Sequence, residues 1–112
     1  LLAQHSGGVD REAVSRCGDL VLDRIRRRVT RAGNPIELMQ REFQILDLLM
    51  RHKDRVVTRT MLLEQIWDYR FDPHTGLIDT HISRLRKKID FDGAKPLLHT
   101  LRNVGYRLSE QP

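Results

Sequence analysis

Residues 77–90 read Leu77-Ile-Asp-Thr-His-Ile-Ser-Arg-Leu-Arg-Lys-Lys-Ile-Asp90. When this segment is placed on a helical wheel at about 100° per residue, four aliphatic side chains fall within one narrow arc. These side chains are Ile78, Ile82, Leu85 and Ile89. A stripe of this kind is typical of a helix that packs one face against a protein core. The segment is therefore predicted to form an amphipathic helix.

The opposite side of this helix carries hydroxyl groups and cations, from Thr80, Ser83, Arg84 and Lys87. Such a surface suits the major groove of DNA, where an arginine can make a bidentate contact to guanine and a threonine methyl group can contact thymine. A solvated surface helix has the same pattern, and this segment alone does not separate the two interpretations.

Composition narrows the choice of partner. The 112 residues correspond to one small domain, and a net charge of +5 with a pI near 10.0 fits a polyanionic partner.

Cys17 is the single cysteine, so an intramolecular disulfide is excluded and a reducing, cytoplasmic compartment is expected. The sequence contains no apolar run of the about 18–20 residues that a membrane span needs.

The first sixteen residues show no sustained periodicity, and Ser6-Gly7-Gly8 is typical of a flexible joint. We expect residues 1–16 to be a linker tail with little fixed structure, following an upstream domain that is missing because the chain begins with Leu1 rather than methionine. Residues 17–112 are then expected to form the folded domain.

A small antiparallel sheet is predicted after the linker. The strands are expected at residues 20–22, 25–31 and 36–38, with a turn at residues 32–35. The run Arg26-Arg27-Arg28 could contact phosphate, but the exposed face or edge of a sheet is the preferred interpretation. Such a meander needs a helical layer to cover its apolar face.

The remaining elements alternate between helices and short strands. A mostly apolar segment predicts a buried helix at residues 43–52, and Thr58 is a suitable N-cap for another helix at residues 59–67. We also predict a brief strand at residues 56–57, a loop at residues 68–76, and a β-hairpin formed by residues 97–102 and 106–108. This order indicates an α+β winged helix-turn-helix fold, whose hairpin wing can place Arg102 in the minor groove.

In the order and spacing of these segments, the chain resembles the C-terminal winged-helix DNA-binding domain, or effector domain, of OmpR/PhoB-type two-component response regulators. The resemblance covers about residues 18–109 and has five anchors: residues 36–43, 56–59, 62–67, 78–89 and 99–106. It implies an N-terminal four-stranded antiparallel sheet, three helices and a C-terminal β-hairpin wing.

The resemblance also implies roles for individual residues. The expected base contacts are Thr80, Arg84 and Arg102. The expected phosphate contacts are Arg59, Trp67, His81, Ser83, Arg86, Lys87 and Asn103. An ion pair of Arg86 with Asp79 or Glu42 is the alternative for that side chain. A loop that contacts RNA polymerase would contain Asp68, Tyr69, Arg70, Phe71, Asp72 and His74.

Two departures from the family pattern concern the wing and the start of the recognition helix. In the wing, Leu101 and Asn103 replace the usual valine and first glycine; asparagine tolerates left-handed backbone better than other non-glycine residues, so the turn should survive. Gly76 and Leu77 stand where related domains often carry polar contacts, which leaves the target sequence open.

The expected partner is double-stranded DNA with tandem half-sites, bound by a dimer whose isolated domains are monomeric. A sensor histidine kinase would act only through the missing receiver domain. The rival interpretation is a winged-helix module that binds protein and has no affinity for DNA. An enzyme is a more distant rival because the five histidines lack metal-ligand spacing, so we expect neither a metal nor a cofactor.

Overall fold

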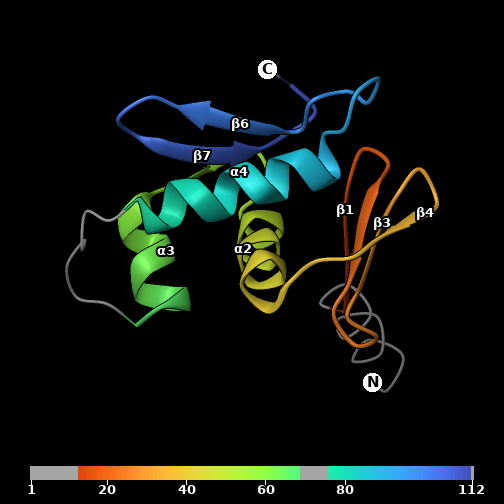
Figure 1. The fold of residues 1–112 in the computed structure, drawn as a ribbon, viewed down its shortest axis with the longest axis horizontal. Coiled ribbons are helices and arrows are strands. Elements are labelled where there is room, and N and C mark those ends of the chain that lie inside the picture. The colour runs from red at the N-terminus through yellow and green to blue at the C-terminus, as the bar shows by residue number, and fades with distance from the viewer. Residues whose placement is uncertain (1–12, 69–75, 112) are drawn as a thin grey trace, which may run out of the picture.

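The computed structural model describes residues 13–68 and 76–111. It begins with a four-stranded antiparallel sheet whose strands lie in chain order: β1 Val14–Cys17, β2 Leu20–Asp23, β3 Arg28–Arg31 and β4 Asn34–Ile36. Three helices follow in the described residues: α2 Gln40–Arg51, α3 Arg59–Ile66 and α4 Leu77–Ile89. A second antiparallel sheet, ordered β5-β7-β6, contains β5 Val56–Val57, β6 Leu98–Leu101 and β7 Gly105–Leu108 (Figure 1). The predicted α+β winged helix-turn-helix fold is confirmed.

The N-terminal sheet corrects two expectations about its strands. Residues 14–16 are not an unstructured tail, because Val14 begins β1 and pairs with Asp23 of β2. The chain turns after β2 instead of starting a strand at Ile25, because the Asp23 carboxylate accepts the backbone N–H groups of Ile25 and Arg26, each at 3.1 Å. Ile25 is consequently 73% exposed.

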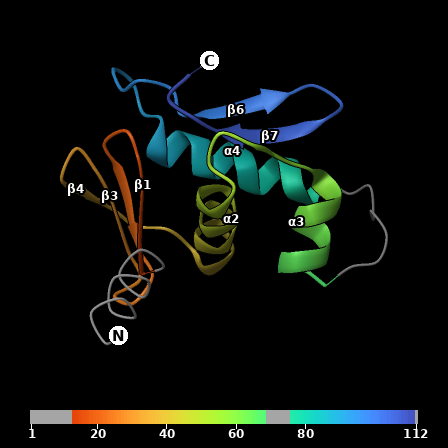
Figure 2. The same cartoon turned by 180° about the vertical axis from the view of Figure 1, so that it is seen from behind.

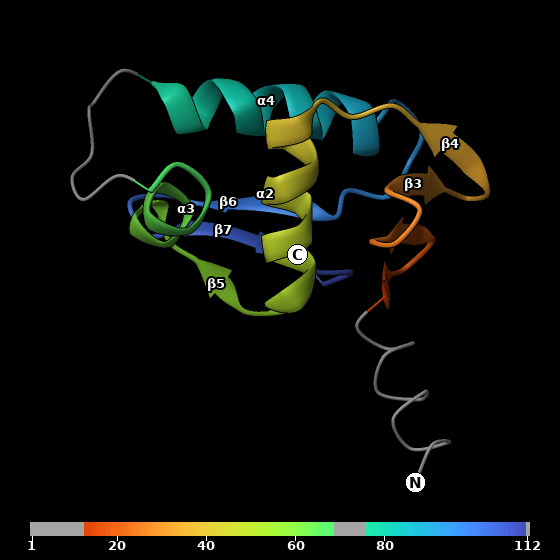
Figure 3. The same ribbon diagram turned by 90° about the horizontal axis from the view of Figure 1, so that it is seen from below.

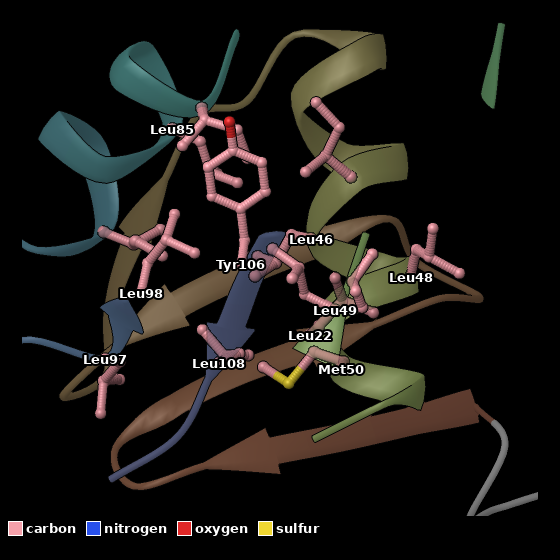
Figure 4. Packing of buried hydrophobic residues seen from close by; sticks show 14 of the residues in the cluster. Leu22, Leu46, Leu48, Leu49, Met50, Leu85, Leu97, Leu98, Tyr106 and Leu108 are labelled. Carbon is pink, nitrogen blue, oxygen red and sulfur yellow. The ribbon is translucent and has the colours of Figure 1, made fainter. Parts of the chain in front are cut away.

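Helix α2 lies in the middle of the molecule, between α3 on one side and the N-terminal sheet on the other (Figure 3). It begins at Gln40, three residues before the predicted start, because the Glu42 carboxylate accepts the Met39 N–H at 2.8 Å. Most of its circumference is buried, as predicted, through Phe43, Ile45, Leu46, Leu48, Leu49 and Met50. Figure 4 shows Leu46 and Leu49 of α2 near Tyr106 and Leu108 of β7.

Helices α3 and α4 begin as the sequence predicts. The Thr58 hydroxyl accepts the Met61 N–H at 3.1 Å and caps α3. Helix α4 follows Gly76, whose φ of 71° lies in the left-handed region that glycine adopts without a steric penalty. The aliphatic stripe of α4 is buried: Ile78, Leu85 and Ile89 are 0% exposed and Ile82 is 2% exposed.

The C-terminal hairpin is present and is wider than predicted, because β5 pairs with β7 and makes the wing three-stranded. Only glycine fits at position 105, because an added Cβ would lie 2.3 Å from the Val57 carbonyl oxygen. Asn103 in the connecting turn has a φ of 63°, which is the left-handed conformation expected for it.

Arg31 joins the N-terminal sheet to the end of α4. Its side chain is 1% exposed and donates to the Asp19 carboxylate, the Ile89 carbonyl, the Asp90 carboxylate and the Lys95 carbonyl. The sheet thus lies beside the C-terminal end of α4, while α3 lies toward the other end (Figure 2). The buried guanidinium of Arg31 therefore connects the turn between β1 and β2, the C-terminal end of α4 and the segment that precedes β6.

Cys17 is fully buried at the end of β1, and burial raises the pKa of its thiol to about 11. The side chain therefore acts as a small apolar residue of the core. Among the described residues, none of the helices combines the length and the apolar composition that crossing a membrane requires.

Candidate nucleic-acid interface

The outward side of α4 consists of Thr80, Ser83, Arg84 and Lys87, all of which are exposed. Within the described part of the chain, none of these side chains forms a hydrogen bond or an ion pair. The buried aliphatic stripe fixes the opposite side of the same helix. The hydroxyl groups and cations on this side of α4 therefore lie together on one helix and are available to bind a partner.

An ion pair between the partly exposed Lys88 and the buried Glu42 fixes the rotation of α4 against α2. Lys88 Nζ lies 2.6 Å from Glu42 Oε1, and Glu42 is only 1% exposed. Burial by itself would raise the pKa of Glu42. The hydrogen bonds from Lys88 and from the Met39 N–H, together with the Lys88 charge, outweigh burial and lower this pKa below its ordinary value.

Replacing Glu42 with glutamine should therefore destabilise the domain at neutral pH but have less effect in acid. A carboxylate with a lowered folded-state pKa contributes stability that is present above its unfolded pKa, about 4.3, and is lost as the pH falls through the folded pKa. Urea unfolding at about pH 7 and about pH 3 measures this difference. Glu64→Gln is the exposed control, with an expected change below about 0.5 kcal/mol. An equal effect of Glu42→Gln at both pH values would contradict the ion pair.

The N-terminal half of α4 is tied to α3 and β7 through Asp79. Its carboxylate accepts from the Arg59 guanidinium at 2.9 Å and from the Tyr106 hydroxyl at 2.7 Å. Burial, followed by the hydrogen bond to Asp79, raises the pKa of Tyr106 to about 12, so the hydroxyl keeps its proton. The Arg59–Asp79 pair is exposed, and an exposed pair contributes little stability, so a phosphate can compete for Arg59.

Arg86 makes neither of the ion pairs considered for it from the sequence, because Asp79 and Glu42 have the partners just described. Its guanidinium instead donates to the Leu98 carbonyl oxygen at 3.3 Å and to the Thr100 hydroxyl at 2.5 Å. Arg86 thus connects α4 to strand β6 of the wing.

The wing turn places Arg102 and Asn103 in solvent. Between this turn and the start of α3 lies a concavity of about 630 Å³, with Thr58, Arg59 and Thr100 among its lining residues. The expected minor-groove residue Arg102 therefore lines the same hollow as the N-terminus of α3. An anionic strand could follow this hollow, because helix N-termini favour negative charge.

Trp67 and His81 lie against each other at the junction of α3 and α4. Their ring centroids are 5.2 Å apart with an interplanar angle of 71°. His81 Nδ1 donates to the Leu77 carbonyl oxygen at 2.8 Å, since a carbonyl can only accept. Both residues are half-buried, so each is partly accessible to solvent.

The loop expected to contact polymerase is described only at its first residue. Asp68 is exposed and has a φ of 57°. Tyr69, Arg70, Phe71, Asp72 and His74 lie outside the described residues.

Sequence reasoning did not identify three side chains that shape this surface, namely Arg41, Lys88 and Tyr106. Each contacts an element other than its own: Arg41 reaches α3, Lys88 reaches α2 and Tyr106 reaches α4. A helical wheel shows which side of one helix is polar, but it contains no signal for contacts between elements.

Comparison with known proteins agrees with this geometry. Residues 33–108 match the family model described as "Transcriptional regulatory protein, C terminal". The transcriptional regulatory protein TrcR of Mycobacterium tuberculosis is 45% identical over 109 residues, which are 96% of this chain and 42% of TrcR. The chain therefore spans less than half the length of this curated relative.

Two solved structures have the same arrangement. The DNA-binding domain of CpxR from E. coli is 35% identical with a TM-score of 0.75, and the match covers 86% of this chain and 95% of that domain. The Klebsiella pneumoniae RstA DNA-binding domain, solved in complex with the RstA box, is 30% identical with a TM-score of 0.78, covering 87% and 97% of the two chains.

Proposed function

Because the chain belongs to the family of C-terminal domains of transcriptional regulatory proteins, we propose that it binds double-stranded DNA sequence-specifically, with α4 in the major groove. The observation that carries this proposal is the outward side of α4, where Thr80, Ser83, Arg84 and Lys87 are exposed while the aliphatic stripe is buried. Arginine and threonine on a helix of this kind are suited to reading base edges.

In this proposal the interface divides into base readers and phosphate contacts. Thr80 and Arg84 contact bases in the major groove, and Arg102 enters the minor groove. The phosphate contacts are Arg59, Trp67, His81, Ser83, Arg86, Lys87 and Asn103. Arg86 already donates a hydrogen bond to the Thr100 hydroxyl of the wing. A phosphate would therefore bind to another part of the Arg86 guanidinium, and the bond to Thr100 would remain. The arrangement around the concavity, with Arg59 on one side and Arg102 on the other, supports simultaneous contact by α4 and the wing.

The function of the whole protein extends this proposal. We place this domain at the C-terminal end of a two-component response regulator that controls transcription, after a receiver domain and a linker, because the chain matches only 42% of TrcR. A sensor histidine kinase would then act on the receiver domain. Tandem half-sites, dimerisation on DNA and contact of the loop after Asp68 with RNA polymerase are further parts of the proposal.

Selection of bound sequences from a random duplex pool tests DNA binding. The affinity for a selected duplex should fall with rising salt with a log–log slope of about −3, if Arg59, Arg86 and Lys87 each neutralise one phosphate. A module that binds only protein predicts no enrichment of any sequence and no affinity for duplex DNA. No catalytic role is needed for this function, and the family description names only transcriptional regulation.

Replacing Arg102 with alanine should mainly reduce the preference for A·T-rich sequence flanking the core site, because arginine is attracted to the narrow minor groove of such segments. Affinities for duplexes with A·T-rich and G·C-rich flanks measure this preference. A flank preference equal to that of the parent chain would remove the wing from sequence readout.

A further inference from the structure

Arg41, on the first turn of α2, reaches across to the end of α3. Its Nη1 donates to the Ile66 carbonyl oxygen at 2.7 Å and to the Gln44 side-chain oxygen at 3.1 Å. Ile66 is the last residue of α3, and the final carbonyl groups of a helix have no partner inside that helix. A cation at this position also interacts favourably with the helix dipole. Arg41 therefore caps the C-terminus of a neighbouring helix.

The same guanidinium lies against Trp67, the C-cap residue that follows α3. Its Cζ atom is 5.4 Å from the centroid of the indole ring, within the range of a cation–π contact. The indole ring in turn meets His81 of α4 at 5.2 Å in an edge-to-face arrangement. Arg41, Trp67 and His81 thus form a continuous row of contacts that runs from α2 past the end of α3 to α4.

We infer that Arg41 is a positioning residue of the DNA interface, which sets the orientation of Trp67 and, through it, of His81 toward phosphates. This inference rests on the proposed function, because Trp67 and His81 matter here as phosphate contacts. Arg41 itself remains on the Ile66 carbonyl and acts through the indole ring. Two competing roles make different predictions: direct contact with a phosphate, and a purely structural tie between α2 and α3.

Arg41→Gln should lower the affinity for a selected duplex about two- to fivefold, which is the fold-change expected from the loss of a contact of this strength. The salt dependence of binding should be unchanged. Direct neutralisation of a phosphate by Arg41 would instead reduce the log–log slope by about one in the variant. Arg41→Lys, which retains the charge without the planar guanidinium, should recover part of the affinity and leave the slope unchanged.

Trp67 provides an independent readout because it is the only tryptophan in the chain. In the DNA-free protein, Arg41→Gln should shift the tryptophan emission to longer wavelength and increase quenching by acrylamide, since one face of the indole loses its cover. Arg51→Gln is the matched control on the same helix. Arg51 is 54% exposed and pairs with Asp47, so the same loss of charge should leave both the emission and the affinity unchanged.

A double-mutant cycle with Trp67→Ala decides between the roles, with binding measured by anisotropy of a labelled duplex and folding checked by urea unfolding. If Arg41 acts through Trp67, Arg41→Gln should cause no further loss of affinity in the Trp67→Ala background. An equal loss in both backgrounds, or an Arg41→Gln variant that binds as tightly as its parent, would overturn the inference. A parent chain that binds no duplex would instead overturn the proposed function, and the emission shift would still report whether Arg41 holds the indole.

Discussion

Arg31→Ala should lower the free energy of unfolding by about 3–5 kcal/mol, the range found when one partner of a buried charged network is removed. The substitution leaves the Ile89 and Lys95 carbonyl oxygens without their donor and removes the ion pair to Asp90, whose side chain is 6% exposed. It also leaves a cavity at one of the largest fully buried side chains. Urea unfolding followed by circular dichroism measures the loss.

The control for this prediction lies on the same strand. Arg28 is exposed, and Arg28→Ala should change the free energy of unfolding by no more than about 0.5 kcal/mol. Arg31→Lys should give an intermediate loss, because lysine keeps the charge but cannot serve all the acceptors with a planar fork. If Arg31→Ala were as stable as Arg28→Ala, the contacts of Arg31 would not hold the sheet to α4.

Arg84→Ala should weaken binding to a selected duplex by about 1–3 kcal/mol and relax the preference at one base position, because the proposed bidentate contact to a base edge would be lost. Arg84 is exposed on the outward side of α4 and has no partner among the described residues, so its removal should leave stability almost unchanged. Affinities for duplexes that differ at each position of the site measure both effects.

Lys87→Ala is the control for Arg84, one turn further along the same side of α4. As a proposed phosphate contact, Lys87 should affect all sequences similarly, and its loss should reduce the salt slope by about one. An Arg84→Ala variant that binds its site as tightly and as selectively as the parent chain would remove Arg84 from base readout.

Periodicity in the sequence predicted those features that depend on one element at a time. The buried quartet of α4 follows from the wheel, and the cap at Thr58 follows from a hydroxyl that precedes an apolar segment. The Gly105 and Asn103 positions in the wing agree with the backbone each residue tolerates. These signals sufficed for the order of elements and for the outward side of α4.

The remaining features depend on contacts between distant segments, which leave no local signal. The sequence predicts that Ile25 starts a strand, but the Asp23 carboxylate closes a turn after β2. Arg31 looked like an ordinary strand residue and is instead a buried junction. For Arg86 the sequence offers an acidic partner as the alternative to phosphate, whereas the wing supplies a carbonyl and a hydroxyl group.

In the proposed complex, DNA covers the outward side of α4 and the wing turn. Backbone amide NMR shifts recorded during titration with a selected duplex test this directly. The largest changes should lie in α4 between Thr80 and Lys87 and in the turn containing Arg102 and Asn103. Changes confined to the N-terminal sheet or to the exposed side of α2, with those amides unaffected, would contradict it.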